Sequence, residues 1–257
     1  MSASIPFRQP PGVAEAAGSV SEGTNRRVVL GTDRPMRLDC GVELSNFTVA
    51  YSTFGTLNAD RSNAVMVCHA LTGDHFVTDY HPVSGKPGWW SMLVGPGRPI
   101  DTDRYFVICS NVIGGCMGST GPASLNPATG KVWGLDFPII TIPDMVRAQA
   151  LLLDHLGVGR LKAVVGGSMG GMQAYHWAAR YPDLVERAAV VCGSARCSPY
   201  NYVFLEGVKA ALTADPAYRD GRFVDKPTAG LRAMGRVYAG WAMSHEFYRE
   251  EIGRAHV

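Results

Sequence analysis

The chain lacks several features that would assign it to a membrane, a secretory route or a nucleic acid. Its apolar runs all fall short of the roughly 18 residues that a spanning helix needs. Residues 1–27 are polar and rich in small residues, without the uninterrupted apolar stretch of a secretory signal. The formal net charge is only +2 and no basic stripe is present, so electrostatics gives no reason to expect nucleic acid as a partner. We therefore expect a cytoplasmic protein with a flexible leader over residues 1–27.

Paired cysteine spacing of the kind that binds a metal is also absent, so we predict no metal site. Three of the six cysteines lie within apolar, strand-like runs. This pattern predicts reduced, mostly buried thiols in a reducing compartment. The six are Cys40, Cys68, Cys109, Cys116, Cys192 and Cys197.

Internal repeats and low-complexity blocks are missing, and 257 residues with 46% hydrophobic content can bury a full core in one domain. Short apolar runs at 42–54, 64–68, 105–110, 161–165 and 188–192 predict strands, the later ones buried. Helical patterns follow at 143–156 and 172–181. The first helix is predicted to start at the cap Thr141 with Asp144 three residues on, and to end at Gly157. Strands alternating with helices favour an α/β fold, with a mostly parallel sheet covered by helices on both faces.

The most informative motif runs from Gly166 to Gly171, with Ser168 between glycines after an apolar strand and before a helix. This context is typical of a nucleophile elbow, where a sharp turn lifts the serine hydroxyl above the sheet edge. Gly166 and Gly170 supply room for the strained turn. A glycine-rich structural turn is the alternative. We assign Ser168 as the candidate nucleophile.

The loop after an earlier strand, Cys68 to Asp74, is placed to complete an oxyanion hole. We expect the backbone amides of Leu71 and Met169 to be its two donors. His69 precedes the serine and ends a strand. We therefore interpret it as a residue that shapes this loop, with a role as general base as the alternative.

A serine nucleophile needs a base, normally a histidine oriented by a carboxylate later in the chain. His176 lies eight residues beyond Ser168 in the following helix, roughly 12 Å along its axis, and does not readily reach back. His245 is interpreted as a partly exposed helical residue rather than a base, and His256 is next to last. Four later aspartates are interpreted as solvated loop charges: Asp183, Asp215, Asp220 and Asp225.

Several longer motifs, in order from about Gly41 to Pro182, resemble the homoserine O-acetyltransferase family of the α/β-hydrolase fold. They are Arg61 to Val65, Cys68 to Asp74, Gly88 to Trp90, Gly95 to Gly97, Ile100 to Thr102, Arg104 to Cys109, Asn111 to Cys116, Gly118 to Pro122, Phe137 to Pro138, Thr141 to Val146 and Gly166 to Gln173.

The resemblance implies acetyl transfer from acetyl-CoA, a co-substrate rather than a bound cofactor, to the hydroxyl of L-homoserine in methionine biosynthesis. Ser168 would carry the acyl group as an ester at the bottom of a narrow tunnel. An arginine of the helical lid would bind the acceptor carboxylate; Arg236 is our candidate and Arg232 the alternative. L-serine as acceptor and succinyl-CoA as donor stay open. The family also implies a homodimer of the full-length form.

Family members continue well past residue 257, and the resemblance places the triad aspartate and histidine there. We therefore expect a truncated, nearly inactive chain that lacks terminal strands, with His256 in a foreign tail. The predicted organisation is a leader (1–27), an α/β-hydrolase core (28–195), a partial helical lid (196–251) and a non-native tail (252–257). A serine esterase or thioesterase of the same fold and a non-catalytic fragment are the alternative functions.

Overall fold

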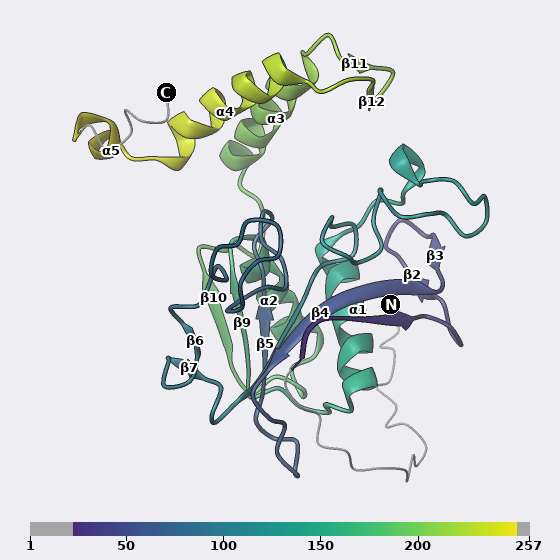
Figure 1. Cartoon of the computed structure of the whole chain (residues 1–257), viewed down its shortest axis with the longest axis vertical. Helices are drawn as coiled ribbons and strands as arrows, with labels where there is room; N and C mark the ends of the chain where they lie inside the picture. The colour runs from purple at the N-terminus through teal and green to yellow at the C-terminus, as the bar shows by residue number, and fades with distance from the viewer. Residues whose placement is uncertain (1–22, 251–257) are drawn as a thin grey trace. The chain divides into compact units, whose positions relative to one another are not determined.

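The computed structural model describes residues 23–250, and the chain divides into two compact units between Ala195 and Arg196. The first is an α/β unit and the second is helical (Figure 1). The predicted tail 252–257, including His256, lies outside the described residues, as does most of the predicted leader. Within residues 23–250, no helix combines the length and the apolar character needed to cross a bilayer.

A six-stranded mixed sheet forms the centre of the first unit, in the order β1-β4-β8-β5-β9-β10. The last four strands of this order are mutually parallel, and β1 and β4 add an antiparallel edge. The α/β fold with mostly parallel strands is therefore confirmed. The strands are β1 (Gly23–Leu30), β4 (Phe47–Phe54), β5 (Ala64–Cys68), β8 (Phe106–Ser110), β9 (Ala163–Gly167) and β10 (Ala188–Val191).

Three further pieces of regular structure lie in the connections of the first unit. Two of them are short two-stranded sheets and one is a single 3₁₀ turn. They are β2 (Met36–Arg37) with β3 (Glu43–Leu44), β6 (Val94–Gly95) with β7 (Ile100–Asp101), and η1 (Gly134–Asp136).

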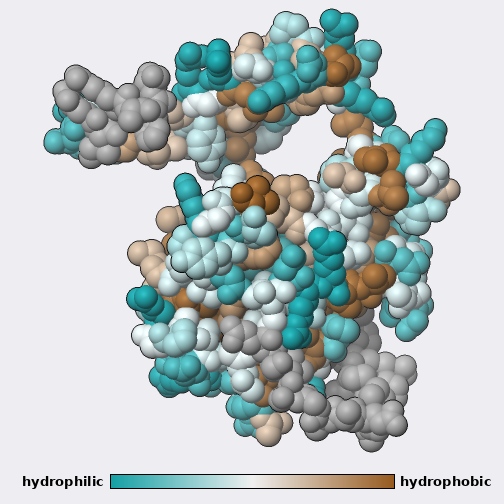
Figure 2. All heavy atoms as spheres, viewed as in Figure 1, coloured by the Kyte–Doolittle hydropathy of each residue, from teal (hydrophilic) through white to brown (hydrophobic). Residues whose placement is uncertain are grey.

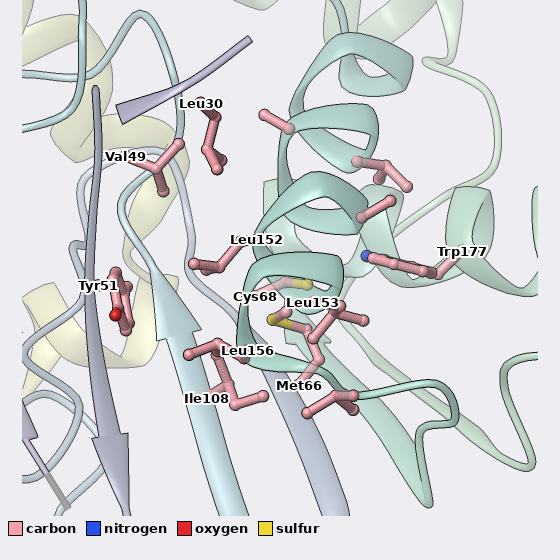
Figure 3. Close-up of a cluster of buried hydrophobic side chains, with 14 of the residues drawn as sticks. Leu30, Val49, Tyr51, Met66, Cys68, Ile108, Leu152, Leu153, Leu156 and Trp177 are labelled. Atoms are coloured by element: carbon pink, nitrogen blue, oxygen red, sulfur yellow. The ribbon is translucent and has the colours of Figure 1, made fainter. Parts of the chain in front are cut away.

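The helices α1 (Ile142–Leu156) and α2 (Met169–Arg180) pack on one face of the sheet. Central strand β5 shows why the sheet is buried on both sides: Met66 and Cys68 join the cluster under these helices (Figure 3). Val65 and Val67, which alternate with them, belong to a second cluster on the opposite face. Residues 76–105, with their short strands, cover that face. Among the described residues, the predicted helical cover therefore exists on one face only.

The start of α1 has the predicted capping box. The Thr141 hydroxyl accepts from the backbone amide of Asp144, and the Asp144 carboxylate accepts from the amide of Thr141. Arg147 forms ion pairs with both Asp144 and Asp39. The pKa of Asp39 lies below its ordinary value, mainly because the Thr141 hydroxyl donates to it and secondly because Arg147 does. Gly157 ends the helix in the left-handed conformation, as its sequence position predicts.

Several boundaries differ from the sequence predictions. Residues 23–27, assigned to a flexible leader, form the first part of β1. The predicted strand 42–54 is broken before β4, at Asn46 with φ 49°. Helix α2 begins at Met169, three residues earlier than the predicted start at residue 172, because the turn at the serine leads directly into it.

Two burial predictions were wrong. Strand β10, predicted to be buried, is largely exposed, because within residues 23–250 it pairs with β9 alone and α2 covers one of its faces. Only Cys68 and Cys109 are fully buried; Cys197 is half-buried and the other three free cysteines are exposed. Burial of the thiols therefore follows the central strands and not the apolar character of the surrounding sequence.

The second unit is a helical hairpin of α3 (Pro199–Thr213) and α4 (Thr228–Ala242), followed by α5 (His245–Arg249). The short strands β11 (Tyr218–Arg219) and β12 (Arg222–Phe223) form its tip. Phe204 stacks on Trp241 with 4.3 Å between ring centroids. Residues coloured as hydrophobic nevertheless reach its surface in Figure 2. The large exposed side chains of this unit include Tyr200, Tyr202, Val203, Leu231, Val237, Tyr238 and Met243.

Asp215 is not the solvated loop charge that the sequence predicts. It is buried, and its carboxylate accepts hydrogen bonds from the backbone amides of Gly230, at 2.7 Å, and Ala217, at 2.8 Å. These bonds, that of Gly230 first, hold the pKa of Asp215 below its ordinary value. Pro227 at the N-cap of α4 offers no side-chain cap, so Asp215 satisfies a free amide of that helix from the end of α3.

Candidate active site

Ser168 occupies the sharp turn between β9 and α2. Its backbone has φ 55° and ψ −118°, in the left-handed region that non-glycine residues rarely adopt. The side chain is exposed. Such strain at an exposed serine, held between a partly buried strand and a helix, is the geometry of a nucleophile elbow.

The glycines on either side of Ser168 are required by close backbone approach. A Cβ atom at Gly166 would overlap the carbonyl oxygen of Gly170, and one at Gly170 would overlap the carbonyl oxygen of Cys68. Both overlaps involve backbone atoms, which do not move aside easily. The first turn of α2 therefore lies directly on the end of β5.

This packing brings the two predicted oxyanion donors to one edge of the sheet. Cys68 pairs with Gly166 in the neighbouring parallel strand, and Leu71 follows Cys68 by three residues. The Leu71 side chain is 73% exposed, and Met169 is the first residue of α2. Among the residues that the structure describes, neither backbone amide donates a hydrogen bond to another group. Both amides are therefore available to an acceptor at this edge.

His69 is held by both of its ring nitrogens. Nδ1 lies 2.7 Å from the carbonyl oxygen of Ala70, and Nε2 accepts a hydrogen bond from the backbone amide of Val112 at 3.1 Å. Burial lowers its pKa, so the ring is neutral with the proton on Nδ1. With both nitrogens engaged, His69 braces the loop from Cys68 to Asp74 and has no free nitrogen for a proton transfer.

Asp74 anchors the far end of the same loop, a role that the sequence analysis missed. Its carboxylate accepts from the backbone amide of Phe76 at 2.8 Å and contacts Nε2 of His81 at 2.9 Å. Trp89 donates its indole N–H to the Asp74 carbonyl oxygen at 3.0 Å. The only available signal was an aspartate directly before an apolar segment, which is too common to be diagnostic.

Within residues 23–250 no histidine forms a hydrogen bond with the Ser168 hydroxyl, and three further histidines are engaged elsewhere or lie away from it. His176 lies two turns along α2, half-buried, and burial lowers its pKa. Nδ1 of His81 accepts backbone amides of the 81–84 turn, so both of its nitrogens are also engaged. His245 is exposed at the start of α5, in the second unit. Residues 23–250 thus present the serine without a base that these contacts identify.

Arg236 and Arg232, the candidates for carboxylate binding, both lie on α4, four residues apart and therefore on one helix face. Both side chains are exposed. Neither forms an ion pair or hydrogen bond with another residue in the part of the chain that the structure describes. Their surroundings within the helical unit do not favour one over the other.

Groups of three or more His, Cys, Asp or Glu side chains able to hold a metal ion do not occur within residues 23–250.

Residues 63–241 match the model of a family described as having the alpha/beta hydrolase fold. A homoserine O-acetyltransferase of Rhodopseudomonas palustris strain HaA2 is 63% identical over 212 residues, which cover 81% of this chain and 53% of that protein. One of Nitrobacter hamburgensis is 60% identical, covering 82% of this chain and 53% of that protein. The chain therefore spans about half the length of the curated relatives that it matches.

Solved structures that share this fold have names that describe two kinds of activity. A homoserine O-acetyltransferase from Bacillus anthracis superposes with a TM-score of 0.80 at 32% identity, covering 88% of this chain and 62% of that one. An acetylester hydrolase from Corynebacterium glutamicum superposes with a TM-score of 0.76 at 32% identity, covering 90% and 62%. Fold similarity therefore does not by itself separate transfer to an acceptor from hydrolysis.

Proposed function

Since the chain belongs to the alpha/beta hydrolase fold family, we propose that it carries the nucleophile half of an acetyltransferase site, in which Ser168 takes an acetyl group from acetyl-CoA and passes it to the hydroxyl of L-homoserine. The observation that carries the proposal is the strained, exposed Ser168 beside two free backbone amides. The 63% identical relative named homoserine O-acetyltransferase supports the choice of reaction.

The reaction proceeds in two displacements. Ser168 Oγ attacks the thioester carbonyl, its proton passes to a base, and the tetrahedral oxyanion accepts hydrogen bonds from the amides of Leu71 and Met169. Collapse of this intermediate releases CoA, whose sulfur takes up a proton, and leaves acetyl-Ser168. The homoserine hydroxyl then attacks that ester and loses its proton to the base. The second tetrahedral intermediate expels Ser168 Oγ, which takes up that proton, and O-acetyl-L-homoserine leaves. Each oxyanion donor contributes about 3 kcal/mol to the transition state.

We also propose where the general base and the carboxylate that orients it lie in the sequence. The ring nitrogens of His69 and His81 are already engaged, and His176 lies too far along α2. We place the activating histidine and aspartate in the part of the homoserine O-acetyltransferase relatives that this chain does not cover. The 257-residue chain alone should then show only slow acylation of Ser168.

Acceptor recognition is proposed for Arg236, with Arg232 as the alternative. A planar guanidinium binds a carboxylate through two parallel hydrogen bonds, as an amino-acid acceptor requires. The exposed apolar side chains of α3 and α4 support the further proposals of lid helices that shield the acyl-enzyme and of a homodimer through them. Six free cysteines support a cytoplasmic location.

Hydrolysis is the second candidate, supported by the superposition on an acetylester hydrolase. The two are separated by measuring CoA release from acetyl-CoA with and without L-homoserine. The assay uses this chain continued by the part of the Rhodopseudomonas palustris relative that lies beyond the match, with the 257-residue chain in parallel. Release that depends on homoserine and yields its O-acetyl ester supports transfer. Release at the same rate without homoserine, with acetate as product, would establish an esterase or thioesterase.

A further inference from the structure

A chain of buried side-chain amides lies beneath the elbow and has no part in the chemistry described above. Gln149 of α1 and Gln173 of α2 are 2% and 0% exposed, and Nε2 of Gln149 donates to Oε1 of Gln173 at 2.7 Å. Nε2 of Gln173 in turn faces the carbonyl oxygen of Met169 at 3.5 Å. Hydrogen bonds thus lead from the middle of α1 to the residue directly after Ser168.

The direction of these hydrogen bonds is set by Trp177. Its indole N–H can only donate, and it donates to Oε1 of Gln149 at 2.7 Å. In Figure 3 the indole nitrogen of Trp177 faces α1. With its oxygen engaged in this way, Gln149 must present its NH₂ group to Gln173, and Gln173 must present its own NH₂ group to Met169. One donor-only side chain therefore orients both amides.

The same oxygen of Gln149 also contacts the end of β5. Sγ of Cys68 lies 3.8 Å from it, within hydrogen-bonding range for sulfur. Burial raises the pKa of the Cys68 thiol to about 12, so the thiol keeps its proton and can donate. Cys68 is the last residue of β5 and the first of the braced loop that carries Leu71.

Gln149 is thus linked to both sides of the oxyanion site, through Gln173 to Met169 and through Cys68 to the strand that leads to Leu71. We propose that Gln149 is a positioning residue that fixes the spacing of the two oxyanion amides, with Gln173 as its link to the elbow. The catalytic meaning of this inference rests on the proposed function, but the mechanical link between Gln149 and the elbow does not. Buried polar groups are costly when unpaired, so each link holds the next in place.

The test compares two substitutions that remove the amides with one that only weakens the core. Gln149→Met and Gln173→Met keep an unbranched side chain of similar volume but cannot relay hydrogen bonds. Leu153→Ala, in the buried face of the same helix α1, opens a cavity but leaves both glutamine side chains in the protein. The free energy of unfolding of all three variants is measured first. Their exchange rates are then compared under conditions that give the variants equal free energies of unfolding.

The primary readout is hydrogen exchange of the Met172 amide, which donates to the Ser168 carbonyl oxygen and closes the turn on the nucleophile. We expect about tenfold faster exchange in both glutamine variants, beyond any change seen in Leu153→Ala. Exchange that rises equally in all three at matched stability would overturn the proposal. If Gln149→Met does not fold, Gln173→Met decides the outcome, because it breaks the hydrogen bonds to Gln149 and Met169 but leaves those of Gln149 with Trp177 and Cys68 in place.

The second readout is the reaction of Ser168 with a fluorophosphonate, in the extended chain used for the CoA assay. Positioning predicts that the limiting rate of modification falls about tenfold while the half-saturating probe concentration stays the same. An unchanged limiting rate in both glutamine variants would contradict a role in positioning the oxyanion amides. If wild-type Ser168 does not react, the proposed function fails, and the exchange measurement still decides the mechanical link.

Discussion

The backbone amide of Ser168 donates a hydrogen bond to the carbonyl oxygen of Val191 at 2.9 Å. Val191 is the last residue of β10, the exposed edge strand of the sheet. The candidate nucleophile is therefore held from two sides, by β9 directly before it and by the end of β10 beside it. This arrangement stabilises a backbone conformation that serine would not otherwise adopt.

The strained backbone at Ser168 predicts that this serine lowers the free energy of unfolding of the protein. Ser168→Gly should be more stable than Ser168→Ala by about 1 kcal/mol, because only glycine adopts φ 55° without a Cβ penalty. Both variants lose the hydroxyl, so each serves as the other's control. Denaturant unfolding measures the difference, and an alanine variant at least as stable as the glycine variant would show that the turn is not strained.

Close packing at the elbow predicts that adding a single methyl group at Gly170 strongly destabilises the protein. Gly170→Ala would drive a Cβ into the Cys68 carbonyl oxygen, and we expect destabilisation of about 3 kcal/mol. The matched control is Gly207→Ala in α3, where a Cβ meets no atom within 4 Å. That substitution should stabilise its helix by up to about 1 kcal/mol. Equal effects of the two substitutions on thermal unfolding would contradict the packing described for Gly170.

The burial of His75 predicts that the protein loses stability in mild acid. Its side chain is fully buried, and burial lowers its pKa from 6.5 to about 4. Between these two values the unfolded chain binds a proton that the folded protein does not, so the free energy of unfolding decreases as the pH falls. The contribution of one such group is at most about 1.4 kcal/mol per pH unit.

The variant His75→Gln keeps a donor toward Asn25 and cannot titrate. We expect its unfolding free energy to depend less steeply on pH between about 4 and 6.5 than that of the wild type. His69, whose pKa is lowered in the same direction, remains as a common background in both proteins. Parallel pH profiles for the two proteins, from urea titrations, would show that His75 is accessible to protons in the folded state.

Binding of the acceptor carboxylate by Arg236 predicts that substitutions of the two arginines of α4 have different effects on KM. In the extended chain, Arg236→Ala should raise KM for L-homoserine by about tenfold or more, with a smaller effect on the donor. Arg232→Ala is the matched control on the same helix face and should leave both values close to wild type. Reversed behaviour would transfer the role to Arg232, and no effect of either would remove α4 from acceptor recognition.

Much of the fold was predictable because its signals are local. The capping box of Thr141 and Asp144, the end of α1 at Gly157 and the elbow at Ser168 each depend on a few consecutive residues. Asp215 was misread because its partner, Gly230, lies fifteen residues later on another helix. The buried pairing of Gln149 and Gln173 was not predictable from the sequence, because a polar residue in a helix normally faces water. Their contact depends on how α1 and α2 pack.

The order and exposure of the strands were harder to anticipate. An apolar run such as that of β10 predicts a strand but does not indicate whether it lies at the centre or the edge of a sheet. In the same way, Cys192 follows an apolar run but is exposed, whereas Cys68 and Cys109 lie on central strands. Burial depends on neighbours that are distant in sequence, and these appear only in the folded arrangement.

The most direct test of the account is the acylation state of Ser168 itself. The extended chain is mixed with acetyl-CoA, quenched, digested and analysed by mass spectrometry, with Ser168→Ala as control. We predict one acetyl group on the peptide that contains Ser168, lost on addition of L-homoserine as its O-acetyl ester forms. In the alanine variant, transfer should fall at least about a thousandfold. An unmodified Ser168 during turnover, or an acetyl group that leaves only as acetate whether or not homoserine is present, would contradict the account.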